Sequence, residues 1–170
     1  MNESSESSVL TDEERTTAIG LARYAFDYIE AALLVDINHR NRYPRREILP
    51  IPAYFLIHHG IELTLKAYLR HNGVTVRDLS SKKYGHNLHS CYRKAKELGL
   101  LGIFTQSKTD LVGMRMLVNL NHHQGLRYIE TGQKQFPTWS LIESLAVRLH
   151  QAVAPAVGYK TFTVSVKEIK

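Results

Sequence analysis

The sequence of 170 residues contains a single cysteine and no long apolar run. Because Cys91 has no second cysteine to pair with, an intramolecular disulfide framework and a cysteine-based zinc finger are both excluded. No apolar stretch approaches the roughly 20 residues that cross a bilayer, and the Ser/Glu-rich start from Met1 to Val9 lacks the apolar core of a signal peptide. These absences predict a cytoplasmic protein that does not enter a membrane.

The common motifs of nucleotide-binding proteins and hydrolases are also missing. The chain has no GxGxxG, Walker A, GxSxG or HExxH pattern, so we expect no cofactor. Its nine histidines include His58, which lies four residues before Glu62 on an expected helix, a spacing that can share a metal ion. Two ligands do not make a site, and no third ligand is evident. We therefore predict hydrogen-bonded or surface histidines and no metal centre.

The overall composition is that of an ordinary folded domain. Hydrophobic residues make up 44% and charged residues 22% of the chain, which argues against extensive disorder. The formal net charge is +6. That charge is compatible with nucleic-acid binding, but it is also common among proteins that bind no nucleic acid.

Apolar spacing predicts an all-α protein, an antiparallel bundle of about five helices. The first helix starts at a Thr11 capping box and continues to about Asn38, with alanines on its apolar face that would let a neighbouring helix approach closely. The expected helices after it run from Pro52 to Asn72, from Leu88 to Leu98, from Ser107 or Thr105 to Leu120, and from Thr138 to Pro155. We assign residues 1–10 to a mobile N-terminal tail, 11–158 to the bundle and 159–170 to a C-terminal tail whose alternating pattern is typical of a strand.

The helix that ends at Leu120 is apolar on nearly every side. A helix of this kind is buried on more than one face. It is therefore expected either at the centre of the bundle or with one face in a subunit interface.

A basic segment separates the first two long helices. Residues 39–50 contain Arg40, Arg42, Arg45 and Arg46 around Tyr43, with two prolines, and are expected to form a loop. Arginine beside an aromatic ring is a combination that holds phosphates and stacks on bases. The alternative is a solvated loop whose charges only keep the protein soluble.

Several segments, taken together in order, resemble a bacterial branch of the HEPN domain family. These segments are Glu62–Leu69 (ELTLKAYL), Tyr84–Leu88 (YGHNL), Leu120–Asn121 and Leu126–Tyr128 (LRY). The resemblance covers roughly residues 51–128 and implies the same helical bundle, commonly assembled as a homodimer through helix packing.

The same resemblance implies a site. Many HEPN proteins are metal-independent ribonucleases of toxin or defence systems, and their signature is an arginine followed by four to six residues and a histidine. Arg115 and His122 match it, with six residues between them. Arg115 would hold the phosphate and His122 would move the proton. On a continuous helix the two would lie about 10 Å apart along the axis, so the helix must break near Asn119–Asn121 or a second chain must supply one partner.

Two further interpretations remain open at the level of sequence. Arg115 can simply keep one face of a buried helix in solvent, beside an unrelated exposed histidine. Other HEPN domains are non-catalytic and act as antitoxin partners or as binding modules for nucleotidyltransferases. The chain is therefore expected to be either a ribonuclease or a module that binds RNA or a partner protein.

Overall fold

The computed structural model describes residues 11–45, 48–121, 125–126 and 135–160. These residues are all-helical, as predicted, and form no strand within the described ranges. The elements are α1 (Asp12–Arg15), α2 (Ala18–Arg42), α3 (Ile51–His71), α4 (Val76–Ser80), α5 (Leu88–Glu97), the 3-10 turn η1 (Leu100–Gly102), α6 (Lys108–Leu120) and α7 (Trp139–Ala156).

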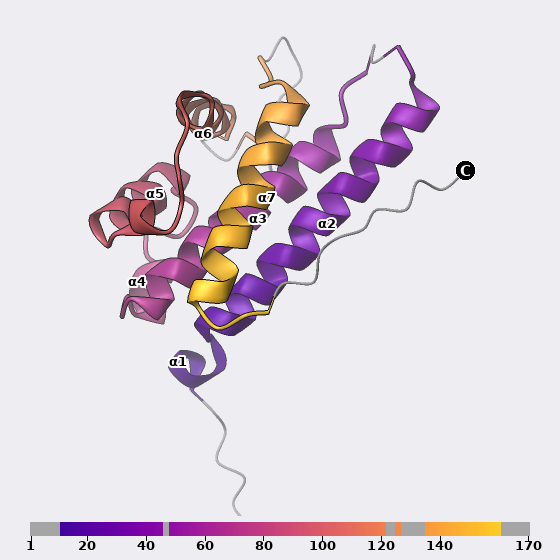
Figure 1. The fold of residues 1–170 in the computed structure, drawn as a ribbon. Coiled ribbons are helices and arrows are strands. Elements are labelled where there is room, and N and C mark those ends of the chain that lie inside the picture. The colour runs from indigo at the N-terminus through magenta and orange to yellow at the C-terminus, as the bar shows by residue number, and fades with distance from the viewer. Residues whose placement is uncertain (1–10, 46–47, 122–124, 127–134, 161–170) are drawn as a thin grey trace, which may run out of the picture.

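Helix α3 is the centre of the bundle. It packs against α2, α7 and α5, and more than half of its residues are buried. Figure 1 shows α2, α3 and α7 side by side along their length, with α5 and α4 on the opposite side of α3 from α2. The longest apolar side chains of α3, including Ile57, Ile61 and Leu65, are fully buried because they face these three neighbours.

Helices α2 and α3 approach each other closely at a glycine. A Cβ atom placed on Gly60 would lie 2.6 Å from Ile29 Cγ1 and 3.3 Å from the Ala25 carbonyl oxygen. Ala22, Ala25 and Ala32 of α2 are completely buried, so the alanines do permit the close approach that the sequence predicted.

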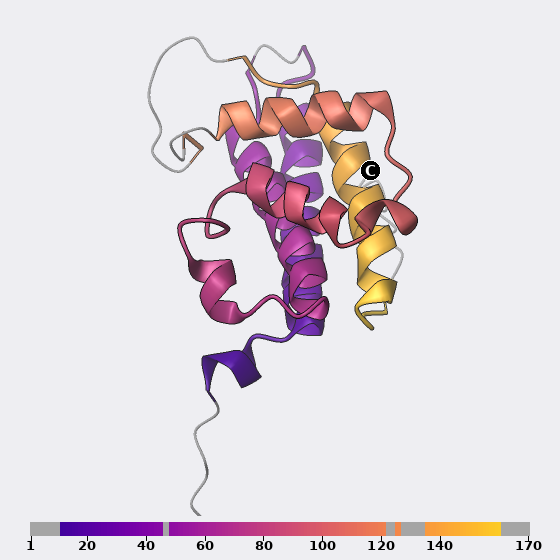
Figure 2. The ribbon, with the colours of Figure 1, turned by 90° about the vertical axis from the view of Figure 1, so that its left-hand side faces the viewer.

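Helix α6 crosses the bundle instead of running along it. Figure 2 shows it lying transversely above α5 and against α7. Gly113 of α6 leaves room for the side chain of Leu141 on α7. The buried carboxylate of Asp110, which also closes the capping box with Ser107, forms an ion pair with Arg148 of α7. The central position expected for this helix is wrong, because α3 occupies it.

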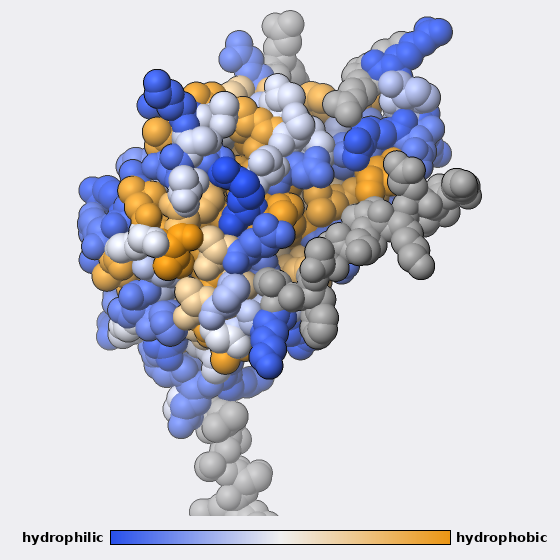
Figure 3. All heavy atoms as spheres, viewed as in Figure 1, coloured by the Kyte–Doolittle hydropathy of each residue, from blue (hydrophilic) through white to orange (hydrophobic). Residues whose placement is uncertain are grey.

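Burial does not account for all of the apolar residues of α6, because part of the helix is exposed. Leu111 and Val112 are 43% and 50% exposed, and the neighbouring Leu101 and Ile103 are 49% and 42% exposed. Figure 3 shows hydrophobic patches interspersed among hydrophilic side chains on the face that carries α5 and α7. The second expectation for α6, a subunit interface, stays a prediction.

The first long helix begins later than the sequence predicted. The Thr11 capping box is present, but it opens only the short α1, and Thr17 then caps α2 by accepting a hydrogen bond from Gly20 N–H at 3.0 Å. Thr11 and Thr17 lie close together in the sequence, and each of them caps a helix. As a result, α1 turns away from the bundle and buries none of its residues.

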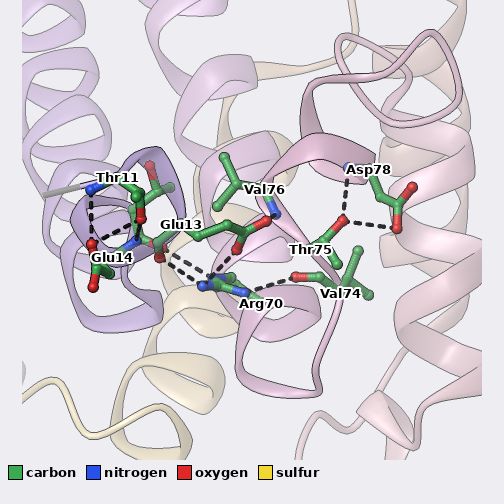
Figure 4. Close-up of polar contacts among 9 residues, drawn as sticks. Thr11, Glu13, Glu14, Arg70, Val74, Thr75, Val76 and Asp78 are labelled. Carbon is green, nitrogen blue, oxygen red and sulfur yellow. Dashed lines mark hydrogen bonds and ion pairs between the residues drawn. The ribbon is translucent and has the colours of Figure 1, made fainter.

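Arg70 fastens α1 to the bundle through polar contacts (Figure 4). Its guanidinium donates to the carbonyl oxygens of Glu13 at 2.8 Å and of Thr16 at 3.1 Å, and it pairs with the Glu13 carboxylate at 2.9 Å. The same carboxylate accepts a hydrogen bond from Val76 N–H at the start of α4. Glu13 thus joins three elements at one point.

Two other boundaries differ from the expected ones. Helix α2 continues to Arg42, one full turn past Asn38, and an Arg40–Asp36 ion pair at 2.9 Å supports this last turn. Helix α2 stops just before Pro44, because a proline disfavours helical backbone angles in the residue that precedes it. The connector after α3 contains the five-residue α4, which Thr75 caps. The strand expected after residue 160 lies outside the described residues.

The structure describes no helix that has both the length and the apolar character to span a membrane.

Buried His150 is expected to make stability depend on pH. Its Nε2 donates to the Ala22 carbonyl oxygen at 2.9 Å, and burial lowers its pKa from the usual value of 6.5. The unfolded chain therefore binds a proton near pH 6.5 that the folded protein does not bind, so stability falls as pH drops below about 6.5.

The slope from this one residue should reach at most about 1.4 kcal/mol per pH unit. Urea unfolding across this range should show a flatter pH dependence for His150→Gln, which keeps an N–H donor, than for the parent protein. His71→Gln, at an exposed position, is the control and should leave the slope unchanged. Equal slopes for the parent and His150→Gln would contradict the assignment.

Candidate functional site

A polar cavity of about 460 Å³ lies between α3, the segment that joins α4 to α5, and the last turn of α6. Three histidines line it together with Lys82: His58 from α3, His86 from just before α5 and His89 from the first turn of α5. The remaining lining residues are Ser80, Ser81, Gly85, Asn87, Leu88, Val118 and Asn121. None of these is acidic, and most carry hydrogen-bond donors.

The wall of this cavity depends on a buried ion pair in α3. Glu62 is 3% exposed and accepts a hydrogen bond from Lys66 Nζ at 2.7 Å. The same ammonium donates to the Gly85 carbonyl oxygen at 2.6 Å, which ties α3 to the turn before α5. The Glu62 carboxylate also lies 3.6 Å from His86 Nδ1. The ion pair between Glu62 and Lys66 therefore also lies against a cavity residue.

Helix α5 begins at this cavity. The Asn87 side chain caps it by accepting a hydrogen bond from Ser90 N–H at 2.9 Å. Behind the cap, the Cys91 thiol is buried and contacts the Tyr84 carbonyl oxygen at 3.3 Å. Burial raises the pKa of Cys91 to about 12, so the thiol stays protonated and is a residue of the core.

The chemistry that these residues offer is recognition of an anion. Imidazole, ammonium and amide groups all donate hydrogen bonds, and Lys82 carries a positive charge next to the positive end of the α5 dipole. The Glu62 carboxylate, which lies 3.6 Å from the cavity residue His86, is already paired with Lys66. A phosphate group matches this set of donors.

Arg115 projects from α6 near this cavity but does not line it. Its side chain is exposed and makes no hydrogen bond or ion pair with the described residues. Val118, three residues further along the helix, does line the cavity, as does Asn121 at its end. Figure 2 shows this end of α6 above the segment that joins α4 to α5.

The helix ends where the predicted arginine–histidine pair requires it to end. Asn121 caps α6 at its C-terminus, so the chain leaves the helix before residue 122. His122 itself lies outside the described residues, and its distance from Arg115 stays untested. The last described residue of this stretch, Asn121, lines the cavity together with the histidines.

The basic segment is divided between a helix and a turn. Arg40 and Arg42 lie in the last turn of α2 instead of the expected loop, and Arg45 follows in the turn after it. The guanidinium of Arg42 lies 6.0 Å from the centre of the Tyr43 ring, the cation–aromatic pairing that the sequence suggested. Arg46 lies outside the described residues. Arg40 and Arg42 of α2 therefore lie on a different helix from Arg115 of α6.

No family model, curated protein or solved structure matches this chain. The resemblance to HEPN domains therefore rests on the motifs quoted above.

No group of three or more His, Cys, Asp or Glu side chains within the ranges that the structure describes has an arrangement that could hold a metal ion. His58 and Glu62 are both buried on α3, and Glu62 is occupied by Lys66.

Sequence reasoning singled out His58 beside Glu62 and missed the cavity that His58 shares with His86 and His89. His58 is 28 residues from His86 in the chain, and only the packing of α5 on α3 brings them together. The Gly85–His86 turn before α5 was the sequence signal that could have indicated the cavity. The Gly85 carbonyl oxygen accepts a hydrogen bond from Lys66, which connects this turn to α3.

Proposed function

We propose that this chain is a HEPN-type ribonuclease that acts in the cytoplasm as a homodimer and needs no metal ion. The observation that supports the proposal is the exposed, unpaired guanidinium of Arg115, one turn before the helix end that lines a donor-rich cavity. Among the described residues, Arg115 has no hydrogen-bond or ion-pair partner.

The reaction would be transfer of a phosphoryl group within RNA. The ribose 2′-hydroxyl attacks the adjacent phosphorus while His122 takes its proton, and the bond to the 5′ oxygen of the next nucleotide breaks as that oxygen receives a proton. Arg115 would neutralise the charge that grows on the phosphoryl oxygens. The products are a 2′,3′-cyclic phosphate and a free 5′-hydroxyl.

Dimer formation would serve two needs at once. It would cover Leu111 and Val112, which are half-exposed on α6. It would also bring a second Arg115 and a second cavity to the same face, so that the two chains form one cleft for the RNA.

Cleavage of single-stranded RNA in excess EDTA tests this proposal. The parent protein should leave 2′,3′-cyclic phosphate ends, and Arg115→Ala and His122→Ala should each lower the rate by about 100-fold or more. Arg93→Ala, an exposed arginine on α5, is the matched control and should cleave normally. The proposal would be wrong if the parent protein cleaves no RNA. It would also be wrong if all variants cleave RNA at equal rates while circular dichroism shows that they are folded.

A non-catalytic module that binds RNA or a partner protein, such as an antitoxin or a nucleotidyltransferase, is the second candidate. This second function is favoured by the exposed arginines Arg40, Arg42 and Arg45. They are distant in sequence from Arg115. RNA binding without cleavage, weakened by substitution of these arginines, would support it.

A further inference from the structure

The ribonuclease reaction needs a proton donor for the 5′ oxygen that leaves. Arg115 keeps its proton at every working pH, and His122 takes the proton of the 2′-hydroxyl in the same step. An alkoxide is a poor leaving group, and the side chain that most often gives it a proton in enzymes is histidine. The polar cavity at the end of α6 offers three histidines: His58, His86 and His89.

Of these three histidines, His86 combines access to solvent with a charged partner. His58 is only 4% exposed, so little of its ring can reach a substrate. His89 is exposed on α5, but it has no acidic partner among the described residues. The side chain of His86 is 43% exposed, and its Nδ1 lies 3.6 Å from the buried Glu62 carboxylate. It is therefore the histidine that can both reach a substrate and be held by the protein.

The carboxylate beside Nδ1 sets the direction of the His86 ring. With Nδ1 turned toward Glu62, Nε2 lies on the other edge of the ring and is left for the cavity. The separation of 3.6 Å is longer than a hydrogen bond, which is common for catalytic pairs before the substrate binds. A carboxylate bonded to Nδ1–H fixes which ring nitrogen faces the substrate, so a proton on Nε2 is presented to the cavity.

The backbone around His86 is anchored on both sides. Lys66 donates to the Gly85 carbonyl oxygen at 2.6 Å, and the Asn87 side chain caps α5. A Cβ atom on Gly85 would lie 2.9 Å from the Ser81 carbonyl oxygen, so the turn packs directly on the backbone before it. His86 thus lies between two fixed residues and beside a fixed carboxylate, which is the preorganisation that an acid catalyst needs.

The same cavity connects His86 with Arg115. Val118 and Asn121, at the end of α6, line the cavity together with His86. Arg115 lies three residues before Val118, so their Cβ atoms are about 5–6 Å apart on one side of the helix. Figure 2 shows this end of α6 above the segment that joins α4 to α5, to which His86 belongs. A phosphate held by Arg115 at the edge of the cavity is therefore expected next to His86.

We propose that His86 is the catalytic acid of the reaction and that Glu62 positions it. The assignment rests on the ribonuclease function proposed above and supplies the proton that the leaving oxygen receives. As the 2′ oxygen bonds to phosphorus, the bond from phosphorus to the 5′ oxygen breaks, and the proton on His86 Nε2 moves to that oxygen. The 5′-hydroxyl leaves, and the neutral imidazole takes a proton from water before the next cycle.

A substrate whose leaving atom needs no proton tests this assignment. The RNA strand carries sulfur in place of the 5′ oxygen at one position, and a thiolate is a far weaker base than an alkoxide, so it leaves without a proton. On ordinary RNA, His86→Gln should cleave about 100-fold or more slowly than the parent protein, the usual contribution of an acid catalyst. On the sulfur substrate the same variant should cleave almost as fast as the parent protein. His122→Ala, which lacks the base, should stay slow on both substrates.

Glu62 acts through His86, so its variant should be rescued by the same substrate. Glu62→Gln keeps an acceptor for Lys66 and removes the charge beside His86 Nδ1. At a temperature where this variant is folded, it should slow cleavage of ordinary RNA less than His86→Gln does, and the sulfur substrate should restore its rate. A purely structural role of Glu62 would slow the cleavage of both substrates alike.

The pH dependence of the rate gives a second readout. An acid catalyst must carry its proton, so the rate of the parent protein should fall as pH rises and the acid loses that proton. His86→Gln should lose this alkaline decline on ordinary RNA, whereas His71→Gln, an exposed histidine at the end of α3, is the control and should keep it. The other titratable groups around the cavity all remain in His86→Gln: Glu62, Lys66, His58, His89 and Lys82.

The outcomes separate this assignment from the function on which it rests. If the parent protein cleaves neither substrate, both are wrong. If the parent protein cleaves ordinary RNA and His86→Gln cleaves it equally fast, the ribonuclease function stands and the assignment of the acid is wrong. The assignment is also wrong if His86→Gln is slowed on the sulfur substrate as much as on ordinary RNA, because the histidine would then not act on the leaving atom.

Discussion

Glu62→Ala is expected to lower the free energy of unfolding by about 3–5 kcal/mol. The reason is the charge that the substitution leaves behind. The Lys66 side chain is only 13% exposed, and without Glu62 its ammonium keeps just the Gly85 carbonyl as a partner. Removing one member of a buried ion pair costs far more than the pair contributes, because a desolvated charge then has no counter-charge.

Chemical denaturation of matched variants measures this effect. Glu97→Ala is the control, since Glu97 forms comparable pairs with Arg93 and Lys94 on the exposed face of α5 and should change stability by about 0.5 kcal/mol or less. The double substitution Glu62→Met/Lys66→Met removes both charges, so it should recover much of the loss. If Glu62→Ala costs no more than Glu97→Ala, the ion pair does not support the wall of the polar cavity.

Gly60→Val should destabilise the protein by about 3 kcal/mol, at the upper end of the cost of overpacking a core. A Cβ atom at this position would already collide with Ile29, and the nearby Ala25 carbonyl belongs to the backbone of α2 and cannot rotate away. The two longest helices would have to separate, which would loosen the core of the bundle.

Thermal or urea unfolding should show this loss for Gly60→Val and little change for Gly102→Val, where nothing lies within 4 Å of the added Cβ. Adding Ile29→Ala to Gly60→Val should restore part of the stability by making room for the valine. A result in which both glycine variants behave alike would mean that α2 and α3 can move apart at little cost.

The sequence was sufficient to predict the fold class because the helices are amphipathic and separated by clear breaks. The expected bounds of the helix at Leu88 and of the helix at Trp139 agree with the structure to within a few residues. The N-terminal capping box was also found, but the helix it opens was extended too far, since Thr17 caps again five residues after Asp12. A local sequence pattern does not show which of two nearby cap residues begins the long helix.

The cavities could not be predicted because each assembles residues that are distant in the chain. A second cavity, where α2, α3 and α7 meet, combines Asp36, Tyr54 and Trp139 from three helices, and no motif links them. Arg40 was recognised as part of a basic segment, but its position on a helix depends on the ion pair with Asp36. The roles expected for Arg115 and His122 came from a family resemblance and remain proposals.

The polar contacts that attach α1 determine which part of the protein unfolds first. This helix buries no side chain, so the free energy that holds it comes from Arg70, Glu13 and a few backbone hydrogen bonds. Such contacts weaken as ionic strength rises, whereas the apolar contacts between α2, α3 and α7 do not. The protein therefore contains two cooperative units of unequal stability. Increasing salt should detach the N-terminal unit while the bundle that holds both cavities stays intact.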